Sequence, residues 1–210
     1  IVRALRSEAL LPANVELIHG DALELDLDRL AGEVPGTVRV VGNLPYAIAS
    51  LLLRRMLDWR ERLASWSVMV QKEVAGRLLA TPGARAYGSL TVLHQLVATV
   101  KIGLDLHPRC FYPVPRVTST FLHLTPRSEV SIAAGELRTV EGVVRAAFAH
   151  RRKTIVNSLR TAAAGSPLPP ERIAETLASH GIDRRARAQS LSPEQWLAVA
   201  RALSRADRRR

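Results

Sequence analysis

The strongest constraint on the fold is an alternation of β-rich runs with helix-like stretches, which stops at Thr125-Pro126-Arg127. In the helix-like stretches the apolar residues recur at helical spacing, as at Ile48, Leu51, Leu52 and Met56. The predicted strands span residues 15–19, 38–41, 67–71, 100–106 and 117–124, and the predicted helices span 1–12, 47–59, 73–79 and 87–98. This order predicts an α/β domain over residues 1–127, built on a mostly parallel, doubly wound sheet.

Residues 128–210 carry no further strand pattern, and turn signals at 165–167, 181 and 192–193 divide them into helices. Ser192 followed by Pro193 is typical of a helix start, because Ser caps the helix and Pro suits its first position. We therefore expect a small, all-helical second domain over residues 128–210.

The chain has a formal net charge of +11, and its last 83 residues contain 15 Lys and Arg against 8 Asp and Glu. An excess of this size favours a polyanionic partner such as nucleic acid, although an Arg-rich composition can also arise without one. The single cysteine, Cys110, excludes an intrachain disulfide and is compatible with a reducing cytoplasm. No apolar run reaches 18 residues, so we expect no spanning helix and no membrane partner.

The tetrapeptide Asn43-Leu44-Pro45-Tyr46 directly follows the apolar run 38–42. The exocyclic amine of adenine is a poor nucleophile, and accepting hydrogen bonds from its two N–H groups directs its lone pair towards a methyl donor. The Asn43 oxygen can accept one bond and a carbonyl near Leu44 the other, because Pro45 fixes the turn, and Tyr46 can stack on the base. The alternative is an ordinary strand-turn-helix corner with Asn as helix cap.

Two further segments carry candidate binding residues. Asp21 and Ala22 come directly after Gly20, which follows the predicted strand over residues 15–19. The Asp21 carboxylate can accept a hydrogen bond from the amino group of a cofactor adenine. A plain turn is the alternative. In the loop 111–117, Pro113 and Pro115 restrict the backbone, which makes the loop a stiff mount for Phe111 to stack on a flipped base. A Pro-bounded connection to the last strand is the alternative there.

The segment His150-Arg151-Arg152-Lys153 places four basic-capable residues in succession, which suits phosphate contacts. A solvated charged face is the alternative. His150 has no second ligand at suitable spacing, so we expect no metal site.

Several segments together closely resemble the small-subunit ribosomal RNA adenine dimethyltransferase family, and the resemblance covers essentially the whole chain. The tetrapeptide 43–46 resembles the methyl-acceptor motif of amino-directed, S-adenosylmethionine-dependent methyltransferases. With Leu at its second position, the motif resembles that of the ribosomal RNA adenine dimethyltransferases. The other segments that carry the resemblance are 20–23, 70–75 with 87–90, 111–119, and 148–154 with 157–159.

The resemblance implies a Rossmann-like domain, the cofactor S-adenosyl-L-methionine and dimethylation at N6 of two adjacent adenosines near the 3′ end of 16S rRNA. It also implies the precursor small ribosomal subunit as partner, a role in ribosome biogenesis, a cytoplasmic location and a monomer. The expected catalytic residues are Asn43, Leu44, Pro45, Tyr46 and Phe111; the cofactor-binding residues are Asp21, Ala22 and Asn43; the RNA-binding residues are Arg116, His150, Arg151, Arg152 and Lys153.

The chain departs from the family pattern at its front. The family has a Gly-rich loop after its first strand and an acidic residue after its second, whereas residues 1–20 contain no G-x-G. We therefore expect an N-terminally truncated form of a complete enzyme, without its first strands and half of its cofactor site, which can leave this chain inactive. Two alternatives remain: a large-subunit rRNA adenine methyltransferase of the antibiotic-resistance type, and a non-catalytic binding protein for ribosome assembly or transcription.

Overall fold

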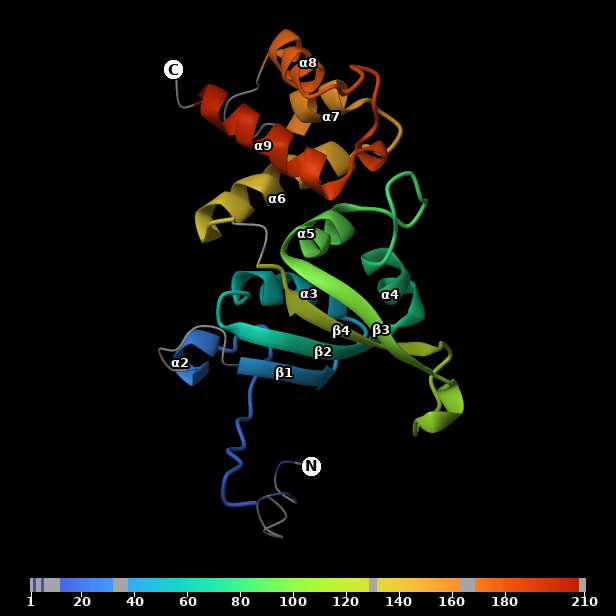
Figure 1. Cartoon of the computed structure of the whole chain (residues 1–210). Helices are drawn as coiled ribbons and strands as arrows, with labels where there is room; N and C mark the ends of the chain where they lie inside the picture. Colours follow the sequence, from blue (N-terminus) through green and yellow to red (C-terminus); the bar gives the residue numbers. More distant parts are fainter. Residues whose placement is uncertain are drawn as a thin grey trace.

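In the computed structural model, which describes residues 2, 5, 12–31, 38–128, 132–162 and 169–207, a sheet with its helices is followed by a group of helices (Figure 1). The elements of the first part are α2 (Leu27–Ala31), β1 (Val38–Asn43), α3 (Ala49–Asp58), β2 (Leu63–Gln71), α4 (Lys72–Leu78), α5 (Ser89–Val97), β3 (Ala98–Leu106), the 3₁₀ turn η1 (Pro108–Cys110) and β4 (Ser119–Pro126). The helical part contains α6 (Ala134–Phe148), α7 (Ile155–Ala162), α8 (Pro170–Ser179), η2 (Ala188–Ser190) and α9 (Pro193–Asp207).

The four described strands form one sheet in the order β1-β2-β4-β3. β1 pairs with β2 in parallel, whereas β4 is antiparallel to both β2 and β3. Three of the four described strands, β1, β2 and β3, therefore run in the same direction and β4 runs against them, which agrees with the predicted α/β fold class and places the one reversed strand between β2 and β3. β3 and β4 are joined by residues 107–118, which hold only the short turn η1, and a parallel pair would need a longer crossover, usually a helix.

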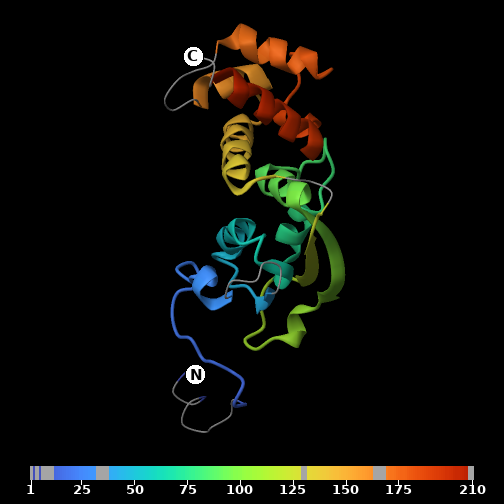
Figure 2. The same cartoon turned by 60° about the vertical axis from the view of Figure 1, so that its left-hand side comes forward.

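One face of this sheet is buried beneath α3, α4 and α5 (Figures 1 and 2). Side chains alternate along each strand, so the even-numbered residues of β2 and β4 point to this face: Trp66, Val68, Val70, Leu122 and Leu124 are all completely buried. On the opposite face Val41 is 75% exposed. At Asn43, the carboxyl end of β1, the sheet therefore has one face covered by helices and one face exposed to solvent.

The helices α6–α9 stand together beyond α5, at the end of the molecule opposite β1 (Figures 1 and 2). The predicted start of α9 is confirmed: the Gln195 N–H donates to Ser192 Oγ at 3.2 Å, and the Ser192 N–H donates to Gln195 Oε1 at 2.9 Å. This reciprocal pair is a capping box. The prediction of an α/β part followed by helices alone is confirmed, and the domain boundary at residues 127 and 128 stays a prediction.

The predicted strand over residues 15–19 is wrong, since these residues have no regular secondary structure. A strand is stabilised by a neighbour that accepts and donates its backbone hydrogen bonds, and none of the described strands pairs with this run. The predicted helix over residues 1–12 lies mostly outside the described residues. In the part of the chain that the structure describes, no helix is both long and apolar enough to cross a membrane.

Candidate active site

The tetrapeptide 43–46 forms the corner between β1 and α3. Asn43 closes the parallel pairing opposite Met69, and the Leu44 N–H continues it by donating to the Met69 carbonyl at 3.1 Å. Leu44 itself is only 7% exposed, and the Pro45 carbonyl accepts the Ile48 N–H at 3.1 Å, which begins the helical turn. The corner is thus fixed by backbone bonds and by burial of the Leu44 side chain.

Two acceptors at this corner remain available. The Asn43 side chain is exposed and makes no hydrogen bond to any described residue, and no described group donates to the Leu44 carbonyl. The alternative reading of Asn43 as a helix cap is not supported: the N-cap of α3 is Ile48, without a side-chain capping bond. An amide oxygen and a carbonyl oxygen on adjacent residues suit a ligand with two N–H donors on one atom.

Tyr46 is anchored from a distant part of the chain. Its hydroxyl oxygen lies 2.6 Å from Oγ of Ser119, the first residue of β4. Ser119 is completely buried, so the bond satisfies a hydroxyl that has no access to water. The sequence reading gave Tyr46 a stacking role and Ser119 only a place in a motif; the structure brings the two together, because β4 lies beside β2 at the centre of the sheet.

The loop over residues 107–118 ends at that same point. Phe111 is half-buried, and its N–H donates to the Pro108 carbonyl at 3.1 Å. At the far end of the loop the Lys72 N–H donates to the Thr118 carbonyl at 2.9 Å. Arg116 is exposed, as an RNA-binding residue must be. The roles predicted for Phe111 and Arg116 stay predictions, on a loop now shown to be tied at both ends.

Asp21 and Ala22 occupy a turn rather than a strand end. Asp21 Oδ1 accepts the Leu23 N–H at 2.8 Å, while its other carboxylate oxygen accepts no bond from the described residues. Downstream, the Leu25 carbonyl accepts Arg55 Nη2 at 2.9 Å, which ties this turn to α3. No contact within the described part of the chain joins Asp21 to Asn43. The strand that was expected to bring them to one edge is absent, so their shared cofactor role stays a prediction.

The basic segment 150–153 connects α6 to α7. All four residues are exposed, but Arg151 has a structural contact: its Nη2 donates to the Arg85 carbonyl at 2.7 Å and lies 3.1 Å from the Tyr87 carbonyl. Arg151 therefore fastens the helical part to the connection between α4 and α5. The other three, His150, Arg152 and Lys153, remain the better candidates for phosphate contacts.

An aromatic cluster joins the two parts beside Arg151. Tyr87 is completely buried, and its hydroxyl donates to the Leu191 carbonyl at 2.9 Å. The ring of Phe148 lies 6.1 Å from that of Tyr87 and 6.0 Å from that of Trp196, in tilted geometry. Burial raises the pKa of the Tyr87 hydroxyl, so it remains a neutral donor. Sequence reading missed this role of Tyr87 and Phe148, since the packing joins segments distant in the sequence.

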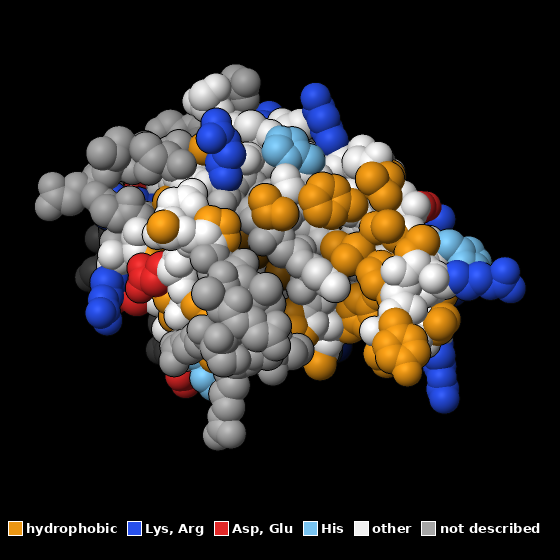
Figure 3. Space-filling model, turned by 90° about the horizontal axis from the view of Figure 1, so that it is seen from below, with side chains coloured by type: hydrophobic (Ala, Val, Ile, Leu, Met, Phe, Trp, Pro, Cys, Tyr) orange, Lys and Arg blue, Asp and Glu red, His pale blue; other side chains and the backbone are white. Residues whose placement is uncertain are grey.

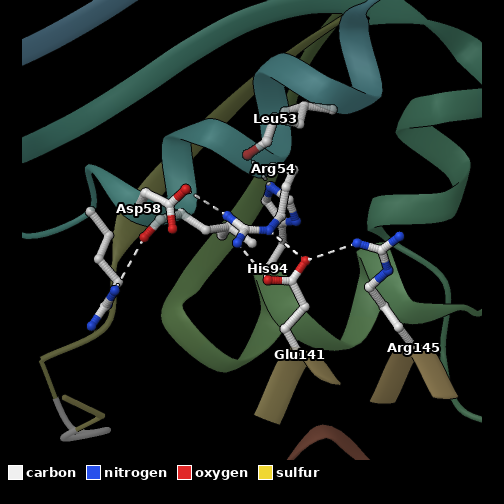
Figure 4. Close-up of polar contacts among 8 residues, drawn as sticks. Leu53, Arg54, Asp58, His94, Glu141 and Arg145 are labelled. Atoms are coloured by element: carbon white, nitrogen blue, oxygen red, sulfur yellow. Dashed lines mark hydrogen bonds and ion pairs between the residues drawn. The ribbon is translucent and has the colours of Figure 1, made fainter. Parts of the chain in front are cut away.

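A charged pair connects α3 with α6 (Figure 4). Arg54 Nε lies 2.6 Å from Glu141 Oε1, and Arg54 Nη2 lies 2.5 Å from Glu141 Oε2. The hydrogen bond to Glu141 raises the pKa of Arg54. Arg55, Arg138 and Arg145 line an open cleft of about 690 Å³ beside the pair. The cleft is basic, but its central arginine is already engaged by a carboxylate.

His94 of α5 lies behind this pair, completely buried (Figure 4). Its Nδ1 is 2.8 Å from the Leu90 carbonyl oxygen, and its Nε2 is 3.2 Å from the Leu53 carbonyl oxygen. Burial lowers the pKa of His94 to about 4. The ring is therefore neutral at pH 7 and carries one N–H, so it donates to one of these two carbonyls and packs between α5 and α3 rather than acting as an acid–base group.

The fold is that of the Rossmann-like rRNA methyltransferases. A dimethyladenosine transferase from Plasmodium falciparum superposes with a TM-score of 0.72 at 21% identity, over 97% of this chain and 76% of that one. The 23S rRNA methyltransferase ErmE superposes with a TM-score of 0.61 at 24% identity, over 96% of this chain and 77% of that one. At these identities the likeness establishes the fold alone.

The chain belongs to the ribosomal RNA adenine dimethylase family, whose model matches residues 1–205. The ribosomal RNA small subunit methyltransferase A of Desulfitobacterium hafniense is 42% identical over 189 residues, which are 90% of this chain and 66% of that protein. The protein of the same name from Xanthobacter autotrophicus is 41% identical over 192 residues, which are 90% of this chain and 63% of that protein. The chain thus spans somewhat less than two thirds of these relatives.

Proposed function

We propose that this chain forms part of an S-adenosylmethionine-dependent enzyme that dimethylates N6 of two adjacent adenosines near the 3′ end of 16S rRNA in the precursor small ribosomal subunit. Membership of the adenine dimethylase family and relatives named for the small subunit support this substrate. The 23S rRNA alternative has weaker support, since the structure named for it is only 24% identical. A role in ribosome biogenesis follows from the same proposal.

The observation that carries the proposal is the pair of available acceptors at Asn43 and Leu44. One N6–H of the adenine donates to the Asn43 oxygen and the other to the Leu44 carbonyl, which holds the amine and directs its lone pair away from the ring plane. Because the corner is fixed by the Leu44–Met69 bond, these acceptors need no rearrangement to receive the base. Tyr46 and Phe111 supply the aromatic rings proposed to stack on the base.

S-adenosylmethionine would supply the electrophilic methyl group. The described residues match the hydrogen-bonding groups of this cofactor in part. Asp21 has a carboxylate oxygen that accepts no bond from the described residues and suits the amino group of the cofactor adenine, and Ala22 is next to it. The described residues offer no counterpart of the Gly-rich backbone loop. We therefore propose that Asp21, Ala22 and Asn43 form one side of the cofactor site.

The deciding experiment measures cofactor binding and methyl transfer for the 210-residue chain and for a version of it extended upstream in the same reading frame. Substrates are 16S precursor particles, and 23S precursor particles serve as the matched control. We expect the extended version to bind S-adenosylmethionine and to methylate the 16S particles alone. Methylation of the 23S particles would favour the large-subunit alternative. Absence of binding by both proteins would favour a non-catalytic assembly role.

A further inference from the structure

Tyr112 is completely exposed, which is unusual for an aromatic side chain in a folded protein. It stands on the loop 107–118 with Val114, which is 60% exposed, and Val117, which is 40% exposed. The adjoining strand β3 adds Ile102 at 59% and Leu104 at 51%. Seen from below, hydrophobic side chains gather on the side of the molecule where this loop lies, with cationic and His side chains at the outer rim (Figure 3). An apolar patch of this kind marks an interaction surface.

Backbone hydrogen bonds hold the part of the loop that precedes Tyr112. Within η1 the Cys110 N–H donates to the His107 carbonyl at 2.9 Å, and the Phe111 N–H donates to the Pro108 carbonyl at 3.1 Å. Phe111 is extended, with φ −124° and ψ 151°, and neighbouring side chains of an extended chain point to opposite sides. Phe111 is half-buried whereas Tyr112 faces solvent. The two rings therefore differ in their surroundings, and we treat them as separate contact sites.

The surroundings of Tyr112 are cationic. Arg109 and Arg116 are exposed on the loop, and the one acidic residue between positions 99 and 118 is Asp105. Asp105 is already engaged, because Lys72 Nζ lies 2.7 Å from its Oδ2 and Thr120 donates to its Oδ1 at 2.6 Å. An exposed aromatic ring among uncompensated arginines suits a nucleic acid, whose bases stack and whose phosphates pair with cations. An apolar protein partner would leave those cations unpaired.

We propose that Tyr112 stacks on a second, unpaired RNA base, distinct from the adenine at Asn43, while Arg109 and Arg116 bind the flanking phosphates. The inference rests on the proposed function and extends it, since it assigns a specificity contact outside the acceptor corner. The loop leads directly to Ser119, which is bonded to Tyr46, so a base held by Tyr112 fixes the RNA strand relative to the corner. RNA is read in this way through unstacked bases in loops.

The test uses the full chain and RNA hairpins corresponding to the 3′ end of 16S rRNA, with 2-aminopurine replacing one loop nucleotide at a time. Stacking on an aromatic ring quenches 2-aminopurine fluorescence. The wild type should quench one position besides the target adenosines, and Tyr112→Ala should abolish that quenching and weaken binding roughly 5- to 150-fold. Tyr112→Phe should retain both, and Tyr112→Leu, which keeps an apolar side chain without a ring, should lose the quenching.

The failure of the inference can be distinguished from that of the proposed function. If the wild type binds the hairpin and Tyr112→Ala matches it in affinity and fluorescence, the stacking site is refuted and the proposed function stands. If the wild type does not bind the hairpin, the stacking site is refuted, whereas the proposed function is decided separately by methyl transfer to the 16S precursor particles. If Tyr112→Ala leaves RNA binding unchanged but abolishes binding of a ribosomal protein from the small subunit, the surface serves a protein partner and the inference is wrong.

Discussion

The Tyr46 hydroxyl oxygen lies 2.6 Å from Ser119 Oγ, so the corner after β1 is bonded to the first residue of β4. The two residues are 73 positions apart in the sequence. Tyr46 belongs to the acceptor corner, and Ser119 ends the loop that carries Phe111 and Tyr112. The bond therefore sets the distance between the proposed acceptor of the base and the proposed stacking residues.

Removal of this bond should affect both stability and catalysis. Tyr46→Phe leaves the buried Ser119 hydroxyl without its partner, and we expect a loss of about 1–3 kcal/mol in the free energy of unfolding. Ser119→Ala should cost about 1 kcal/mol, because Tyr46 is only partly buried. Methyl transfer by the active enzyme should fall about tenfold or more in either variant, since the corner is displaced. Urea unfolding of both single variants and the double variant measures the coupling; strictly additive losses would show that the bond contributes nothing.

Asn43→Ala should separate catalysis from binding. The variant removes one of the two acceptors for the amine, and we expect methyl transfer to fall about 100-fold or more, by analogy with loss of one preorganised group at other active sites. RNA binding should stay within about twofold, because Asn43 makes no contact that shapes the RNA surface. Transfer of radiolabelled methyl groups and filter binding of 16S RNA provide the two measurements. An equal loss of both would assign Asn43 to RNA binding instead.

The elements near the corner were predictable because their signals are local. The run 38–41 is apolar and is followed by Pro45, and β1 forms there; Ser192-Pro193 begins α9 as expected. The run 15–19 is also rich in apolar residues yet forms no strand, since a strand depends on a neighbour that composition cannot specify. The sequence therefore located elements better than it located their partners.

The partners within the site were not predictable for the same reason. Ser119 meets Tyr46, Glu141 meets Arg54 and Arg151 meets the Tyr87 carbonyl, and each pair is separated by more than 60 residues. A single sequence gives the chemistry of each side chain but not which distant group it faces. Arg151 illustrates the consequence: in the motif it looks like a phosphate ligand, whereas in the fold it binds backbone carbonyls.

Arg152 and Lys153 should supply phosphate contacts without a structural role. Replacing both with Gln should weaken RNA binding and reduce the slope of log affinity against log salt by about 1.4 to 1.8, the value for two lost contacts. Arg205→Gln, at an exposed position of α9, is the charge control and should leave the slope nearly unchanged. Arg151→Gln should in addition lower thermal stability, because it loses the bonds to the α4–α5 connection. An unchanged slope in the double variant would exclude phosphate contacts at 152 and 153.

The Arg54–Glu141 pair should stabilise the contact between the sheet part and the helical part. Glu141 is 9% exposed, so Glu141→Gln removes the carboxylate that holds two nitrogens of the partly buried Arg54 guanidinium and leaves Arg54 with Asp58 alone as its charge partner; we expect a loss of about 2 kcal/mol. Glu136→Gln is the matched control, because Glu136 pairs with Arg201 between α6 and α9 at a more exposed position. That change should cost below about 1 kcal/mol. Equal losses of unfolding free energy in the two variants, measured with urea, would show that the Arg54–Glu141 pair stabilises the fold no more than the exposed Glu136–Arg201 pair does.

His94 should make stability depend on pH. Its folded pKa of about 4 lies below the ordinary His value of 6.5, so between these values the unfolded chain takes up a proton that the folded chain does not. The stabilisation is therefore complete above pH 6.5 and is lost as the pH falls towards 4, by about 3 kcal/mol in total. His94→Gln keeps an N–H donor for a carbonyl but cannot titrate, so its stability should change less over this range. Urea unfolding of both proteins at pH 7.5, 6.0 and 5.0 measures the difference, and parallel pH profiles would show that His94 is not the group responsible.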